Sequence, residues 1–171
     1  MQLVRRDAAV RVLVCAPSNT AADLLAERLA ASGLDSDKLY RLGVLSRYEE
    51  DMSEDVQRSS LFPGLERLLA FRVVLSTCSS AGMLQALDVP VGHFNYIVID
   101  EAAQAEEPLA MIPIVGFSNA QTNVILAGDP NQLGPNIKSP TAARAGLGKS
   151  YLERLMLIHK VYGLDTQSRK T

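Results

Sequence analysis

The chain has 171 residues, of which 47% are hydrophobic and 21% are charged, and it contains no tryptophan. This size and composition suit one globular domain with a substantial core. The formal net charge of −2 excludes a protein that binds nucleic acid through a strongly basic overall charge, although local donors can still hold phosphates. No signal peptide is evident, and no apolar segment is long enough to span a bilayer, so we expect no membrane partner.

Apolar periodicity and turn residues predict strands that alternate with helices along the chain. Strands are expected at residues 10–15, 38–42, 72–77, 94–99 and 123–127. Helices are expected at residues 1–9 (as the end of a helix), 21–31, 63–70, 83–87, 109–115 and 150–156. Strands that alternate with helices in this way form a parallel sheet with right-handed crossovers. The sequence therefore predicts an α/β fold, a parallel sheet flanked by helices.

Several residues mark the ends of the expected helices. Ser18 or Asn19 can cap the helix at 21–31, and Gly33 can terminate it. Ser150, followed three residues later by Glu153, has the spacing of a capping box. One stretch fits the alternation less well. Residues 46–70 are expected to contain a surface insertion whose first part, with five acidic residues between positions 49 and 55, is solvated.

The apolar strand at 94–99 ends in two adjacent carboxylates, Asp100 and Glu101. In parallel sheets, ligands bind beyond the carboxyl ends of the strands. Neighbouring side chains at a strand end diverge, so one carboxylate can hold a metal-bound phosphate while the other orients a water molecule. This is the Walker B arrangement of a nucleoside triphosphatase. The alternative is a solvated acidic pair at a strand end.

Three other strands run into polar loops, which should meet at the same edge of the sheet. The candidate residues in these loops are Ser18, Asn19 and Thr20, then Thr77, Ser79 and Ser80, and finally Gln132 in the string GDPNQLGP at 128–135. Hydroxyl and amide donors at the start of a helix favour an anion, although helix capping alone would also explain them. The amide of Gln132 can donate to a phosphate or to an attacking water, or it can simply lie in a turn.

Taken together, four segments resemble motifs Ia, Ib, II and III of superfamily 1 helicases, in particular the Upf-like group. They are APSNTAAD at 16–23, STCSSAG at 76–82, DEAAQ at 100–104 and GDPNQLGP at 128–135. The pair His93-Phe94, the pair Ser139-Pro140 and GLGKSYLERL at 146–155 are most similar to the Mov-ten/Armitage branch of RNA helicases. The resemblance implies the first RecA-like domain of a P-loop NTPase, with ATP and Mg²⁺ as cofactors and single-stranded RNA, or DNA, as partner.

The resemblance also implies roles for particular residues. Asp100 would hold Mg²⁺ through water, and Glu101 would polarise the attacking water with help from Gln132. Nucleotide contacts would come from Gln104, Gly128, Asp129 and Gln132. Gln104 would join motif II to motif III, or would only cap the next helix. The nucleic-acid backbone would lie on Ser18, Asn19, Thr20, Thr77, Ser79 and Ser80, without readout of base sequence.

The chain departs from the family pattern in one important respect. No GxxxxGK[ST] phosphate loop occurs in it, because the run that ends in Gly148-Lys149-Ser150 lacks the required first glycine. By resemblance, the P-loop strand would lie upstream of Met1, and the second RecA-like domain would follow Thr171. We therefore expect the chain alone to be inactive and prone to aggregate through an unpaired sheet edge.

Two further readings of the sequence remain open. The chain can be a non-catalytic module that binds RNA or partner proteins of RNA silencing or decay, or it can belong to a DNA-directed relative, since backbone contacts tolerate both nucleic acids. Cys15 and Cys78 form no CxxC pair and read as reduced thiols, which favours the cytoplasm, or alternatively the nucleus.

Overall fold

The computed structural model describes the backbone of residues 2–43 and 63–161, with side chains up to residue 158. Its strands are β1 (Val12–Ala16), β2 (Leu39–Arg41), β3 (Val73–Thr77), β4 (Tyr96–Ile99) and β5 (Asn123–Leu126). They form one sheet in the order β2-β3-β1-β4-β5, and every neighbouring pair is parallel. The predicted parallel sheet is confirmed. Four of its strands lie within the predicted segments, and β1 extends one residue beyond its predicted segment, to Ala16.

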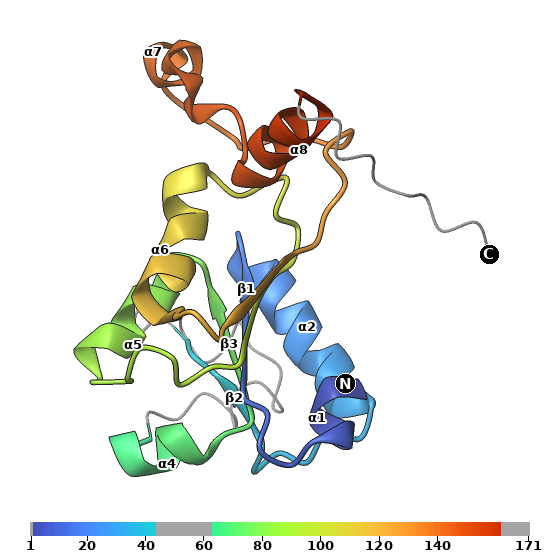
Figure 1. Cartoon of the computed structure of the whole chain (residues 1–171), viewed down its shortest axis with the longest axis vertical. Coiled ribbons are helices and arrows are strands. Elements are labelled where there is room, and N and C mark those ends of the chain that lie inside the picture. The colour runs from blue at the N-terminus through green and yellow to red at the C-terminus, as the bar shows by residue number, and fades with distance from the viewer. Residues whose placement is uncertain (1, 44–62, 162–171) are drawn as a thin grey trace, which may run out of the picture.

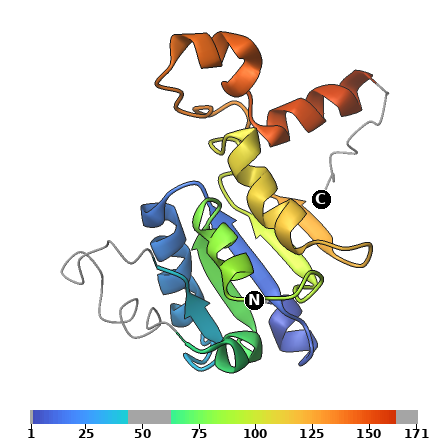
Figure 2. The ribbon, with the colours of Figure 1, turned by 90° about the vertical axis from the view of Figure 1, so that its left-hand side faces the viewer.

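Helices cover both faces of the sheet (Figure 1). One face carries α1 (Gln2–Arg6) and α2 (Asn19–Ala31). The other carries α4 (Leu65–Ala70), the turn η2 (Ser80–Gly82), α5 (Met83–Ala86) and α6 (Glu107–Phe117). The elements α7 (Pro140–Ala142), η3 (Ala143–Leu147) and α8 (Tyr151–Val161) lie beyond one end of the sheet (Figure 2). Among the described helices, none has the length and apolar character needed to cross a membrane.

The alternation of side chains along each strand produces a core on each face of the sheet. Leu13 and Cys15 of β1 join Ile97 and Ile99 of β4 in the larger core, which is covered by α4, α5 and α6. Val73 and Leu75 of β3, with Leu39 of β2, point to the opposite face and pack beneath α2. Both faces of the central strands are therefore buried, as their nearly continuous apolar sequences require.

The predicted helix ends are confirmed by the contacts that satisfy them. The Ser18 hydroxyl accepts a hydrogen bond from the Ala21 amide at 3.2 Å, and the Ser150 hydroxyl accepts one from the Glu153 amide at 3.1 Å. Gly33 follows α2 with φ of +82°, the left-handed conformation in which glycine is favoured. Helix α6 begins two residues earlier than predicted, because Pro108 fits the first turn of a helix, where its missing N–H is not needed.

Most of the expected insertion at 46–70 lies outside the described residues, which resume at position 63. The remainder contains α4, as the Pro63-Gly64 start predicts. This helix is not separate from the sheet, since Leu68 is only 2% exposed and belongs to the larger core.

The two edges of the sheet differ in how well they are covered. At one edge, Leu39, Tyr40 and Arg41 of β2 are all buried. At the other edge, β5 exposes Val124 and Ile125 by 40% and 42%, although its sequence is as apolar as that of the central strands. Strand β5 thus has the composition of an interior strand and the position of an edge strand.

Candidate functional site

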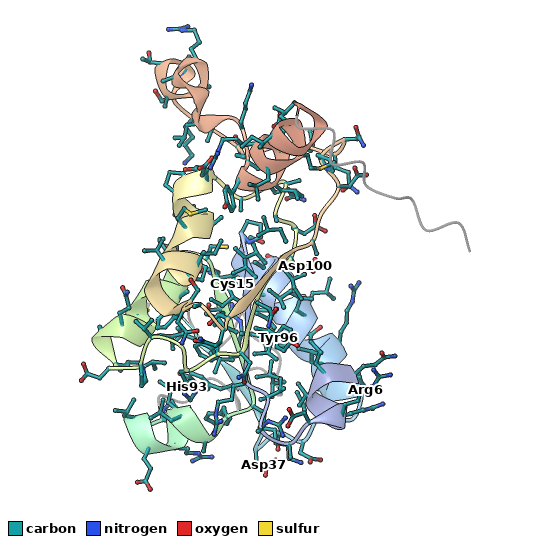
Figure 3. All side chains as sticks on the ribbon, viewed as in Figure 1. Arg6, Cys15, Asp37, His93, Tyr96 and Asp100 are labelled. Carbon is teal, nitrogen blue, oxygen red and sulfur yellow. The ribbon has the colours of Figure 1, made fainter. Side chains whose placement is uncertain are left out.

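The loops after β1, β3, β4 and β5 begin at the same edge of the sheet. The strand register shows this, because Ala16 pairs with Thr77, Cys15 pairs with Ile99, and Ile99 pairs with Leu126. Figure 3 shows Asp100 at the end of the sheet nearer α8, with His93 and Asp37 toward the opposite end. The structure therefore gathers the four polar loops picked out by the sequence at one place, where parallel sheets bind ligands.

The two carboxylates of motif II are held by a tight backbone turn after β4. The Asp100 amide donates to the Cys15 carbonyl at 2.9 Å, so the start of the turn is an extension of the sheet. Glu101 has φ of +51°, a left-handed conformation that is unfavourable for a residue with a side chain. The next amide, that of Ala102, donates to the Ala127 carbonyl at 2.8 Å. Asp100 and Glu101 are both partly exposed.

Gln104 braces the turn that carries the carboxylates. Its backbone amide donates to the Glu101 carbonyl at 2.8 Å, and its side-chain Nε2 donates to Glu101 Oε2 at 3.0 Å. The alternative in which Gln104 caps the next helix is wrong, because α6 has Glu106 as its N-cap. The contact orients one oxygen of Glu101 and leaves its carboxylate accessible to a second donor.

Asp129 organises the motif III loop. Its Oδ1 accepts hydrogen bonds from the Asn131 backbone amide at 2.9 Å and from Asn131 Nδ2 at 3.1 Å. Its Oδ2 lies 3.5 Å from Nε2 of Gln132. The bond from the Asn131 backbone lowers the pKa of Asp129, with smaller contributions from the two side chains. In this structure the exposed Gln132 side chain therefore belongs to the loop's own hydrogen-bond network, and its amide nitrogen is directed at Asp129.

Gly128 joins motif III to motif II through close backbone packing. A β-carbon built at this position would lie 3.0 Å from the backbone nitrogens of both Ala102 and Ala103, and φ is +156°. A contact of this length is tighter than nine in ten real Cβ contacts, so the backbone of Ala102 and Ala103 would have to shift, and the positive φ adds strain for any residue with a side chain. Glycine is thus favoured here because it lets the motif II turn pack closely on the motif III loop, a role that differs from a direct contact with nucleotide.

The motif Ia loop combines exposed donors with a buried anchor. Ser18 and Thr20 are exposed, and Asn19 is partly exposed. Oδ1 of Asn19 accepts a hydrogen bond from Nη2 of Arg41 at 3.0 Å. Arg41, the last residue of β2, was not among the predicted site residues. A charged residue between the apolar residues Tyr40 and Leu42 of a predicted strand was the available signal, because arginine is rarely fully buried without partners.

The motif Ib loop uses two of its three predicted residues internally. Thr77 and Ser80 are buried, with 7% and 8% exposure. The Thr77 hydroxyl donates to Ser80 Oγ at 2.8 Å and accepts from the Ser80 amide at 3.0 Å. Ser79 lies between them and is exposed. These contacts fix the loop and leave Ser79 as the member of the set whose side chain faces solvent.

The described residues contain no group of three or more His, Cys, Asp or Glu side chains that could enclose a metal ion. Proteins commonly bind Mg²⁺ through one or two carboxylates, while phosphates and water complete its shell. A single accessible carboxylate at Asp100 fits that requirement. The two cysteines do not contribute, since both are buried, and burial raises the pKa of Cys78 to about 11 and that of Cys15 further.

The chain is similar in sequence to known proteins over most of its length. A family model described as an AAA domain matches residues 44–140. The chain is 41% identical to mov-10-B.1 of Danio rerio over 170 residues, covering 94% of this chain and 17% of that protein. It is 42% identical to the RNA helicase Mov10l1 of Homo sapiens over 157 residues, covering 85% of this chain and 12% of the relative.

A more distant relative is the ATP-dependent helicase upf1 of Schizosaccharomyces pombe, which is 32% identical over 195 residues, with 92% of this chain and 20% of the relative covered. Among solved structures, the C-terminal part of the Fun30 ATPase domain matches 95% of this chain and 52% of its own, with a TM-score of 0.48 and 14% identity. The chain thus spans a fifth or less of the length of these curated relatives.

The parallel sheet and the family match define a RecA-like α/β domain. The chain belongs to the Upf-like helicases of superfamily 1, within the Mov10 branch. The branch predicted from the motifs is confirmed by these comparisons.

Proposed function

We propose that this chain is part of an ATP-dependent RNA helicase motor, in which hydrolysis of MgATP drives movement along a single strand. The observation that carries this proposal is the convergence of four motif loops at one edge of a parallel sheet. Two of these loops carry acidic and amide side chains suited to phosphate chemistry, and the other two carry neutral donors suited to a nucleic-acid backbone.

On the nucleotide side, Asp100 would hold Mg²⁺ through water, and the metal would neutralise charge on the transferred phosphoryl group. Glu101 would orient the attacking water, with its carboxylate aligned by the hydrogen bond from Gln104. The amide of Gln132 would exchange its contact with Asp129 for one with phosphate or water. Gly128 and Asp129 would hold the motif III loop in place for that exchange.

On the nucleic-acid side, the exposed hydroxyl residues Ser18, Thr20 and Ser79 and the partly exposed Asn19 would bind the backbone of the strand. Thr77 and Ser80 would support this contact through the hydrogen bonds that fix their loop. We propose RNA as the substrate because relatives such as Mov10l1 are described as RNA helicases. A second RecA-like domain would close over the nucleotide. We also propose that the protein acts in the cytoplasm, with the nucleus as the alternative.

The first test is direct binding. Fluorescence anisotropy of a labelled oligouridine should show salt-dependent binding to the purified chain, and replacement of Ser79 by Ala together with Thr20 by Ala should weaken it. Absence of binding at low salt would contradict the nucleic-acid role. Competition with oligodeoxythymidine then decides between RNA and DNA as the preferred strand.

The second test is catalysis by the chain alone. We expect no ATP hydrolysis above background with or without RNA, because no GxxxxGK[ST] loop is present to hold the β- and γ-phosphates. RNA-stimulated turnover that is lost on Glu101→Gln would contradict this expectation. Sequencing the transcript upstream of the Met1 codon separates the remaining alternatives: an in-frame phosphate loop supports a motor, and its absence supports a non-catalytic RNA- or protein-binding module.

A further inference from the structure

Arg41 lies at the carboxyl end of β2 with its side chain completely buried, at 0% exposure. Helix α2 packs over this part of the sheet (Figure 1). Removing a guanidinium from water is costly unless the protein replaces the lost hydrogen bonds. The hydrogen bonds that Arg41 makes therefore indicate the structural role of this buried charge.

The guanidinium connects β2 to the beginning of α2. Its Nε donates to Asp23 Oδ1 at 2.9 Å, and its Nη2 donates to Asn19 Oδ1 at 3.0 Å. A third donor, Nη1, bonds the Leu42 carbonyl. Asn19 and Asp23 are four residues apart, so they lie on the same side of α2, one turn from each other. The planar fork of arginine can reach both at once, which a lysine ammonium cannot do with the same geometry.

The bond to Asn19 determines which end of its carboxamide remains available. A carboxamide has an oxygen that only accepts and an NH₂ group that only donates. Because Arg41 engages the oxygen, the NH₂ group is the end of the carboxamide that can serve an acceptor outside the protein, and Asn19 stands in the chain between the exposed residues Ser18 and Thr20. Phosphate oxygens accept hydrogen bonds, so this orientation presents the group that can bind them.

We propose that Arg41 is a positioning residue for nucleic-acid binding: it holds the Asn19 carboxamide so that its NH₂ group faces the phosphate backbone of the bound strand. This inference rests on the nucleic-acid role of the motif Ia loop proposed above. Arg41 does not touch the strand itself, because it is fully buried beneath α2. Its effect on affinity passes through Asn19.

A double-mutant cycle on the complete 171-residue chain tests the inference. The variants are Arg41→Lys, Asn19→Ala and their combination, and the measured quantity is the Kd for labelled oligouridine at fixed salt. Each single change should raise the Kd by about five-fold, the loss of roughly one hydrogen bond. The double variant should bind no more weakly than Asn19→Ala, because the positioned group is already absent.

A matched control is Arg72→Lys. Arg72 lies just before β3, toward the opposite end of the sheet, where Nε donates to the Val10 carbonyl at 2.7 Å. The same chemical change there should lower stability without changing the Kd for RNA. Circular dichroism melting of every variant establishes that the compared proteins are folded.

Asn19→Asp provides a test that leaves Arg41 in place. Aspartate keeps the acceptor for Arg41 but replaces the NH₂ group with an anionic oxygen, so this variant should remain folded and bind RNA more weakly than Asn19→Ala. Two outcomes would overturn the positioning role alone. One is an unchanged RNA affinity in Asn19→Asp. The other is an effect of Arg41→Lys on the Kd that is equal in the presence and absence of the Asn19 side chain. A wild-type chain that binds no RNA would overturn the proposed function and this inference with it.

Discussion

Nε2 of Gln104 donates a hydrogen bond to Oε2 of Glu101 at 3.0 Å, and Glu101 is at the same time held with a left-handed backbone, φ +51°. The position of the carboxylate that would orient the attacking water is thus constrained twice, by the left-handed backbone conformation of Glu101 and by the hydrogen bond from Gln104. Strained residues of this kind often occur at functional sites, where the surrounding structure enforces them.

The left-handed backbone conformation of Glu101 predicts that glycine at this position stabilises the domain, although the carboxylate proposed to orient water is lost. Glu101→Gly should increase the free energy of unfolding by about 0.5–1 kcal/mol, because glycine adopts positive φ without steric cost. Glu101→Ala removes the same carboxylate but keeps the β-carbon, so it should show no such gain. Urea denaturation of the two variants measures the difference. Equal stabilities would show that the left-handed conformation at this turn carries no energetic penalty.

The backbone contact at Gly128 predicts a large effect from a single methyl group. Gly128→Ala should destabilise the domain by about 1–3 kcal/mol, since the new β-carbon would press on the amides of Ala102 and Ala103. Gly134→Ala, in the same loop, is the control, because its nearest atom would be 3.6 Å away. Chemical denaturation of both variants checks the prediction. Similar effects at the two positions would contradict the proposed packing of motif II on motif III.

The exposed edge of β5 predicts self-association of the purified chain. Val124 and Ile125 present an apolar strand with unpaired backbone groups, which is a template for pairing with another chain. Ile125→Lys should shift the protein toward monomer in size-exclusion chromatography with light scattering. Val115→Lys removes a still more exposed side chain from α6 and should leave association unchanged. A wild-type chain that is monomeric and melts reversibly would refute this prediction.

The ion pair between Glu107 and Arg154 predicts acid sensitivity in the attachment of α8 to α6. Both guanidinium nitrogens Nε and Nη2 bond the carboxylate, at 2.7 and 2.6 Å. These bonds lower the pKa of Glu107 below that in the unfolded chain. The contribution to stability is therefore present above the unfolded pKa and is lost as pH falls through the folded pKa.

Melting curves across acidic pH test this. Glu107→Gln should lower the Tm slightly near neutral pH, because the side chains of the pair are partly exposed to solvent, which screens their interaction. The gap between wild type and Glu107→Gln should close as the pH falls below the normal range for glutamate titration. A gap that stays constant with pH would show that the pair contributes through packing, for example that of Arg154 over the Tyr151 ring, and not through charge.

The sequence by itself determined the alternation of strands and helices, the parallel sheet, and the four loops that meet at one edge. These features follow from local properties: apolar runs such as 94–99 form buried strands, and residues such as Ser18 and Ser150 supply the hydrogen bonds that helix ends need. The Asp100-Glu101 pair was located for the same reason, because its place directly after an apolar strand fixes it at the carboxyl edge.

Only the tertiary structure decided what individual side chains do at that edge. Thr77 and Ser80 bond each other, Gln104 braces Glu101, and Gly128 is favoured by the close approach of backbone from another loop. Arg41 joins the site through Asn19, a residue 22 positions away in the chain. Such contacts depend on distances between strands that are neighbours in space and not in sequence. The pattern of residues along the chain does not specify those distances.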